Sequence, residues 1–143
     1  MQLRIQLACL SAVVLMLQAC TPPTLQPSAV GARRYSTDLV GKAASCTTSP
    51  ITVKDGAPNT VSMTTGGGGW CGVGVNKGGN PYTAGLLTKP PANGHVYVHA
   101  VGDETRIDYT PAHLPAVPDS FTVTLLPGNA TIMVAVNAPG AAK

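Results

Sequence analysis

The sequence has little charge and few aromatic side chains. Lysine, arginine, aspartate and glutamate together make up 10% of the 143 residues, and phenylalanine, tryptophan and tyrosine make up 4%. Apart from the pair Arg33-Arg34, the basic residues are scattered, which excludes the clustered basic surface of a nucleic-acid-binding protein. The three histidines and six acidic residues, without a Gly-x-Ser-x-Gly motif, provide no set of nucleophile, base and acid. We therefore expect a protein that is not an enzyme.

Binding sites for metals and nucleotides also lack support in the sequence. His95 and His99 would share one face of a strand, but four residues of strand separate them by about 13 Å, too far to bind one ion. The acidic residues are dispersed and do not form the oxygen cluster that calcium requires. The glycine run at 66–69 lacks the Lys-Ser/Thr ending of a phosphate-binding loop. We expect no cofactor, no metal and no nucleotide.

Long hydrophobic runs and helical periodicity are missing too. Beyond the first twenty residues, no apolar run approaches the roughly 20 residues of a membrane helix, and no window repeats with the period of an amphipathic helix. Glycine and proline are instead abundant, at 16 and 13 residues. This composition favours turns and is typical of a chain built from short strands.

The N-terminus has the pattern of a secretory signal. In "MQLRIQLACLSAVVLMLQAC" one positive charge, Arg4, precedes an apolar run that ends in small residues. The segment Leu17-Gln18-Ala19-Cys20 resembles the lipobox of bacterial lipoproteins. The resemblance implies removal of residues 1–19 and lipidation of Cys20, which would hold the protein at a membrane. Because Thr21 is not acidic, it also implies the outer membrane, facing the periplasm, with cell-surface exposure as an alternative. An ordinary secretory peptide with a chance cysteine is the competing interpretation.

The remaining cysteines form an even pair. Once Cys9 leaves with the signal and Cys20 carries lipid, Cys46 and Cys71 are left in an oxidising compartment, which predicts a disulfide between them. This bridge would close a loop of about 25 residues and contribute about 3 kcal/mol. A metal site or a redox pair is disfavoured, because the spacing is not Cys-x-x-Cys and no histidine lies nearby.

The segment between the lipobox and the first strand shows no sustained apolar period. Prolines dominate its first part, so residues 20–44 are predicted to be a flexible tether. In the alternative interpretation, Arg33, Arg34 and Tyr35 contact anionic head groups or a partner. Residues 45–138 form the predicted domain, and residues 139–143 a flexible tail.

The domain shows repeated alternation of apolar and polar residues between turn signals. Seven strands are predicted, at 51–54, 60–64, 71–75, 95–100, 105–110, 119–126 and 131–136. Their spacing favours a single antiparallel β-sandwich. Alternation places ten side chains inward, namely those of Val96, Val98, Ile107, Tyr109, Phe121, Val123, Leu125, Ile132, Val134 and Val136.

Residues 86–138 resemble the bacterial Ig-like, cadherin-like domains. The matching positions are Pro91, Asn93, Gly94, Val96, Tyr109, Pro111, Asp119, Phe121, Val134 and Val136. The segment "AHLPAVPDSF" departs from the family, since the Phe and Gly that precede Asp-x-Phe are missing. The resemblance implies an Ig-like sandwich, and such repeats usually occur in large surface adhesins.

The stretch "TTGGGGWCGVGV" at 64–75 contains the only tryptophan. In one interpretation Trp70 packs over Gly72 and Gly74 of its own strand and covers their bare backbone. In the other, Trp70 and Tyr82 form an exposed aromatic contact for a partner. The sequence leaves both open.

Together these features predict a lipid-anchored, non-catalytic envelope protein. It would act as a structural or protein-interaction module at the outer membrane and bind another envelope protein through strand edges or loops. An accessory lipoprotein subunit of a secretion or conjugation machine is the first alternative. A surface adhesin or glycan-binding module is the second.

Overall fold

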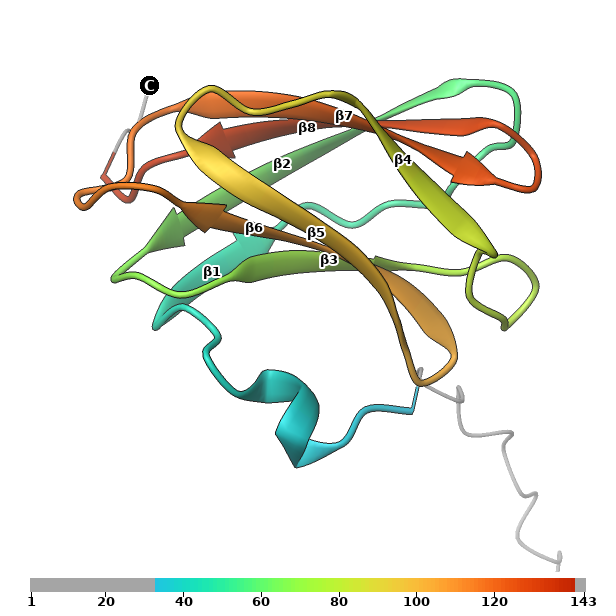
Figure 1. The fold of residues 1–143 in the computed structure, drawn as a ribbon, viewed down its shortest axis with the longest axis horizontal. Coiled ribbons are helices and arrows are strands. Elements are labelled where there is room, and N and C mark those ends of the chain that lie inside the picture. The colour runs from blue at the N-terminus through green and yellow to red at the C-terminus, as the bar shows by residue number, and fades with distance from the viewer. Residues whose placement is uncertain (1–32, 141–143) are drawn as a thin grey trace, which may run out of the picture.

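A computed structural model describes residues 33–140 as two β-sheets packed face to face (Figure 1). The predicted signal peptide, the predicted lipidation site at Cys20 and residues 141–143 lie outside the described residues. One 3-10 helix, η1 (Ser36–Leu39), precedes eight strands. The strands are β1 (Ser45–Thr48), β2 (Pro58–Gly66), β3 (Cys71–Val75), β4 (Ala84–Lys89), β5 (Gly94–Val101), β6 (Glu104–Pro111), β7 (Asp119–Leu126) and β8 (Ala130–Asn137).

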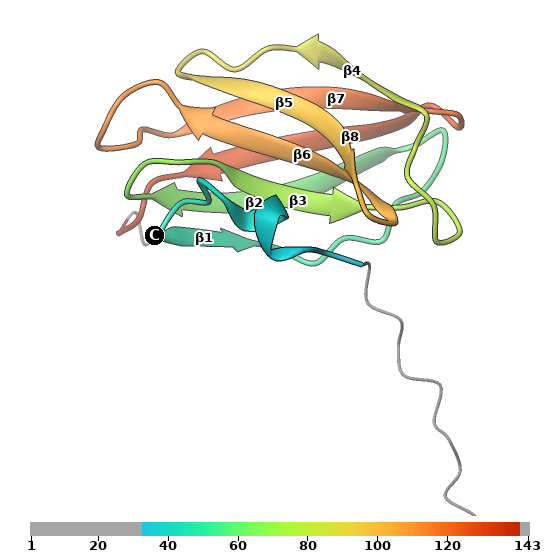
Figure 2. The ribbon, with the colours of Figure 1, turned by 60° about the horizontal axis from the view of Figure 1, so that its bottom comes forward.

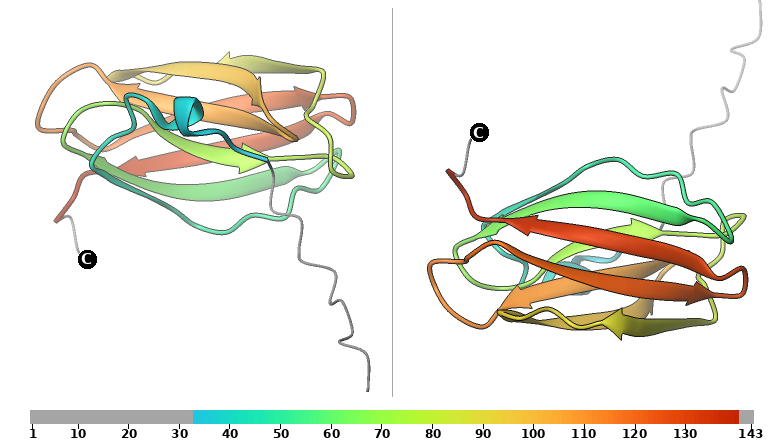
Figure 3. Two further views of the ribbon diagram at one scale, coloured as in Figure 1. Left: turned by 90° about the horizontal axis from the view of Figure 1, so that it is seen from below. Right: turned by 90° about the horizontal axis from the view of Figure 1, so that it is seen from above.

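The two sheets form separate layers (Figure 3). One has five strands in the order β1-β2-β8-β7-β4, and the other has three in the order β3-β6-β5. Every pairing is antiparallel except that of β2 with β8, which is parallel. The predicted β-sandwich is therefore confirmed, with one parallel pair inside it.

The strand order follows that of an immunoglobulin sandwich from its second strand onward. β3-β6-β5 occupies the places of strands B, E and D, and β8-β7-β4 those of G, F and C. In an immunoglobulin sandwich strand A lies beside strand B, but in residues 33–140 of this protein that position beside β3 holds no strand. The first strands, β1 and β2, add to β8 of the opposite sheet, so no strand of residues 33–140 runs along the outer edge of β3.

Apolar side chains from both sheets fill the space between them. All ten side chains that alternation placed inward lie in this core or pack against it. The rings of Tyr109 and Phe121 stack at its centre, with centroids 5.8 Å apart. Period-two alternation on strands that are buried on one face was thus enough to locate the core.

The boundaries of the strands differ from the prediction in three places. Residues 51–54 form no strand, although Ile51 and Val53 pack against the core. The chain there is held by a side chain instead, since the Lys54 N–H donates to Asn59 Oδ1 at 2.8 Å. β1 and β4 were not predicted, because β1 is mostly polar and β4 is a shallow edge strand with exposed Leu86 and Leu87.

The predicted disulfide is confirmed. Cys46 in β1 and Cys71 in β3 are bonded, with Cα atoms 5.3 Å apart. Because the two strands belong to different sheets, the bond ties the edge of one sheet to the edge of the other.

Part of the predicted tether belongs to the packed structure. Residues 20–32 lie outside the described residues, but residues 33–44 cross the outer face of the three-stranded sheet (Figure 2). η1 lies within this segment, and Ala43 at its end is buried. Residues 33–44 therefore belong to the packed structure, ahead of the predicted boundary at residue 45. At the other end, Pro139 of the predicted tail contacts Gly66, while residues 141–143 lie outside the described residues.

Candidate functional site on the three-stranded sheet

The outer face of the three-stranded sheet carries a row of charged side chains on β6. Glu104, Arg106 and Asp108 point away from the core, yet they are only 4%, 8% and 5% exposed. Their burial depends on glycines in the neighbouring strand. A Cβ atom on Gly72 would collide with the Asp108 carboxylate, and one on Gly74 with that of Glu104. The alternating glycines of β3 thus make room for carboxylates.

Each buried charge has an oppositely charged neighbour. Arg106 Nε lies 2.9 Å from Asp108 Oδ1, and a hydrogen bond of 2.9 Å joins the His99 ring at Nε2 to Asp108 Oδ2. Arg34 Nη2 lies 2.7 Å from Glu104 Oε1. Because an unpaired buried charge would be strongly destabilising, these pairs explain how so polar a face can be covered.

Trp70 fastens the N-terminal segment over this face. Its indole Nε1–H donates to the carbonyl oxygen of Val40 at 2.8 Å, and its ring lies 3.9 Å from the guanidinium carbon of Arg106. The main chain adds two bonds: Trp70 N–H donates to Gly41 O at 3.0 Å, and Ala43 N–H donates to Trp70 O at 2.8 Å.

This arrangement corrects the prediction that Trp70 covers the glycines of its own strand. Gly72 and Gly74 are covered by the side chains of β6, while the half-buried Trp70 packs against Arg106 and Gly41. The sequence could not show this, because the buried Arg106 comes from a strand more than thirty residues away.

Tyr82 takes no part in an exposed aromatic contact. It is only 6% exposed and belongs to the core between the sheets. Its main-chain N–H donates to Thr105 Oγ1 at 2.8 Å, and burial raises the pKa of its hydroxyl. The pairing of Trp70 with Tyr82 as a partner-binding surface is therefore wrong, since Tyr82 lies inside the sandwich.

Both arginines of the Arg33-Arg34 pair bind carboxylates of the sandwich. Arg33 donates to Asp103 through Nε and Nη2, at 3.0 and 2.9 Å, in the hairpin between β5 and β6. The hydrogen bond from Arg33 lowers the pKa of Asp103. Arg106 adds a bond from Nη1 to Asp38 O in η1. The segment therefore rests on the sheet through charged contacts at both ends of η1.

Three of the residues that carry the Ig-like resemblance, Asn93, Tyr109 and Asp119, meet at the start of β5. The main-chain N–H groups of Ala92 and Asn93 donate to Asp119 at 3.0 and 2.7 Å, and the Tyr109 hydroxyl lies 3.1 Å from Asp119 Oδ2. Burial by itself would raise the pKa of Asp119, but these backbone bonds and one from Ser120 outweigh it, so the pKa is lowered. This cluster holds the loop before β5.

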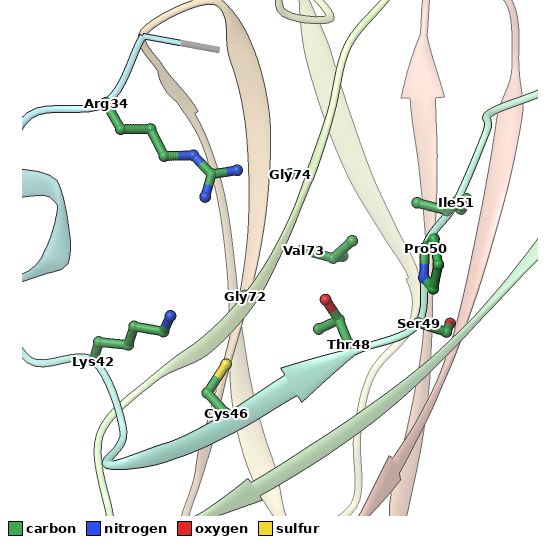
Figure 4. Close-up of a pocket in the computed structure, with 10 residues that line it drawn as sticks. All are labelled: Arg34, Lys42, Cys46, Thr48, Ser49, Pro50, Ile51, Gly72, Val73 and Gly74. Carbon is green, nitrogen blue, oxygen red and sulfur yellow. The ribbon is translucent and has the colours of Figure 1, made fainter. Parts of the chain in front are cut away.

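A groove lies between the outer edge of β3 and residues 48–53 (Figure 4). Its larger part has a volume of about 430 Å³ and is lined by Gly72, Val73 and Gly74 on one side and by Thr48, Pro50 and Ile51 on the other. A second part of about 210 Å³ continues it past Val75 to Asn76. Arg34 and Lys42 reach toward β3 over the larger part (Figure 4). Sequence reasoning missed this groove, although alternating glycines often mark a close approach to a strand.

Two further features were sought in residues 33–140, a metal site and a membrane-spanning helix. This part of the chain contains no group of three or more histidine, cysteine, aspartate or glutamate side chains that could hold a metal ion. Its one helix, η1, is far too short to cross a membrane. Comparison with protein-family models, curated proteins and solved structures gave no match for this chain. The fold and site define a disulfide-bonded β-sandwich with a groove along a free strand edge.

Proposed function

We propose that this protein is a lipid-anchored interaction module of the bacterial cell envelope, without catalytic activity. The lipid on Cys20 concentrates the sandwich at the outer membrane, on its periplasmic side, and the sandwich binds another envelope protein. The observation that carries the proposal is the free edge of β3 with its groove. Natural sheets cover or disrupt exposed edges because an unpaired edge recruits other chains. A groove beside a free edge therefore supports a role in binding.

Two further observations support a location in the cell envelope. The lipobox pattern at Leu17-Gln18-Ala19-Cys20 follows directly on an apolar run. The Cys46–Cys71 disulfide is typical of proteins that fold outside the cytoplasm.

The anchor is tested with two matched variants of the full chain. Cys20→Ser should abolish incorporation of labelled fatty acid and move the protein from the membrane fraction to the soluble fraction. Cys9→Ser changes the other cysteine of the N-terminal segment and should leave both properties unchanged. Membrane retention of the Cys20→Ser protein would refute the lipid anchor.

The interaction role is tested by chemical crosslinking in intact cells at native abundance, followed by purification from membranes. We expect a discrete crosslinked species of higher mass that contains one other envelope protein. Recovery of the uncrosslinked chain alone would refute the role. Protection of the domain from protease added to intact cells would place it on the periplasmic side, and cleavage would place it on the cell surface.

A further inference from the structure

The outer edge of β3 has main-chain groups without partners. β3 is the end strand of its sheet and pairs only with β6. At Trp70 the N–H and C=O both bond to residues 41–43, so they point away from β6. Because these groups alternate in direction along a strand, Gly72 and Gly74 also direct their N–H and C=O away from β6. Within residues 33–140, no main-chain hydrogen bond from outside the β3–β6 pair reaches these four groups.

The groove beside this edge has the length of a short strand. Its two parts share Ile51 and Gly74 and together follow β3 from Gly72 to Asn76. At about 3.3 Å per residue, this distance corresponds to an extended segment of four or five residues. The groove also occupies the place that strand A takes beside strand B in an immunoglobulin sandwich. The site therefore has the shape of a missing strand.

Two cations lie on one side of the groove, spaced along β3. Lys42 pairs with Trp70 at the start of the edge, and Arg34 reaches the Glu104 carboxylate that covers Gly74. Figure 4 shows both side chains directed toward β3. Lys42 forms no ion pair within residues 33–140, whereas Arg34 shares its charge with Glu104. Since every second side chain of a strand points to the same side, two residues i and i+2 of an added strand would meet these two cations.

We propose that the edge of β3 binds an extended acidic segment of another protein as an additional strand. This proposal specifies the partner of the interaction role above and rests on it. The segment bonds to the main chain of Gly72 and Gly74, its two acidic side chains face Lys42 and Arg34, and the residue between them faces Ile51. Main-chain bonds supply binding and the alternate side chains supply specificity.

The chain's own residues 21–32 are a poor occupant. They contain three prolines and no acidic residue, so an amide donor is missing at three positions and no negative charge is offered to Lys42. A second copy of this chain could bind in the groove only by pairing an edge strand of one of its own sheets with β3.

The test uses the full chain with Cys20→Ser and the capped pentapeptide Val-Asp-Val-Glu-Val as the probe. Hydrogen exchange of individual amides is followed by NMR as the peptide is added. The Gly72 and Gly74 amides should exchange at least about tenfold more slowly in the complex, since exchange requires opening of the new hydrogen bonds. The amide of Val73, which faces β6, should change little and serves as the internal control.

Two matched comparisons separate strand addition from non-specific attraction. Methylation of the peptide's amides at the positions that face β3 should abolish binding, and methylation at the alternate positions should be tolerated. Lys42→Glu should weaken binding about tenfold by charge repulsion. Lys89→Glu, the same change on β4 at the edge of the other sheet, should leave binding unchanged.

Several results would overturn the proposal. The first is that the peptide, at millimolar concentration, does not slow hydrogen exchange of the Gly72 and Gly74 amides. The second is that both methylation patterns affect binding equally. The third is that the two amides already exchange slowly in the free protein. Protection that rises with protein concentration alone would point to a second copy.

A photo-crosslinker shows whether only strand addition at β3 is wrong or whether the interaction role itself is wrong. Placed at Thr48 in the groove, it should capture the envelope partner, and placed at Met133 on the exposed face of β8 it should not. Capture from Met133 alone would leave the interaction role intact and refute the groove as its site.

Discussion

Replacing Trp70 with alanine removes the side chain that holds residues 33–43 against the sandwich. The substitution deletes the hydrogen bond to Val40 O and the stacking on Arg106. It leaves in place the disulfide and the core, which lie on the other side of β3. The expected result is a less stable protein in which the N-terminal segment detaches more easily.

The size of the effect follows from the contacts that are lost. The indole hydrogen bond contributes about 1 kcal/mol, and a half-buried cation–π contact about 0.5–2 kcal/mol. Some apolar area of the ring is exposed as well. We expect Trp70→Ala to lower the free energy of unfolding by about 2–3 kcal/mol. Trp70→Phe keeps a ring over Arg106 but has no N–H donor, so it should cost about 1 kcal/mol.

Two measurements check this reasoning. Urea denaturation gives the free energy of unfolding of the wild type and both variants. Limited trypsin digestion gives the rate of cleavage after Lys42, which reports detachment of the segment, with cleavage after Arg106 in the central strand β6 as the measure of global unfolding. If Trp70→Ala has the wild-type urea midpoint and the wild-type rate of cleavage after Lys42, then Trp70 does not fasten the segment and its side chain is free for a partner.

The remaining predictions concern the disulfide, one carboxylate and one glycine. Replacing both Cys46 and Cys71 with alanine should lower the free energy of unfolding by about 3 kcal/mol, because a loop of about 25 residues is freed in the unfolded chain; an unchanged urea midpoint would contradict this. The pKa of Asp119 is lowered in the folded protein, so its stabilisation is complete above the unfolded pKa of about 4 and is lost as the pH falls through the folded value. Asp119→Asn should cost about 2 kcal/mol at pH 7 and less below pH 4, and a constant cost across pH would refute the role of the charge. Gly74→Ala should destabilise the protein by about 2 kcal/mol through its clash with Glu104, and in a double-mutant cycle Glu104→Ala should relieve much of that loss; additive losses would mean that the clash is absorbed elsewhere.

The fold could be predicted because most of its strands turn an apolar face to the core and a polar face away from it. In β6 to β8 apolar residues alternate with polar ones, so each strand and its inward face are visible in the sequence. The hairpin turns were equally clear: Gly128 and Asn129 both have positive φ between β7 and β8, a conformation that these two residue types favour.

Strand pairing was less visible wherever it depends on distant neighbours. Residues 51–54 alternate like a strand, yet they lie across the groove from β3 and have no strand to pair with. β4 does not alternate, and pairing with β7 alone makes it a strand. Alternation reports which face of a segment is buried, but hydrogen bonding to a neighbour decides whether the segment belongs to a sheet.

By itself, the sequence determined the all-β class, the position of the core and the pairing of Cys46 with Cys71, because these depend on local alternation and on a simple count of cysteines. Only the tertiary structure decided what lies outside the core. From the sequence, the polar outward face of β6 would be expected to be exposed to solvent. In the structure residues 33–43 cover this face, and Trp70 holds them there. The free edge of β3 likewise follows from the pairing of β1 and β2 with the other sheet. Contacts between segments far apart in the chain set both features, and no local pattern encodes such contacts.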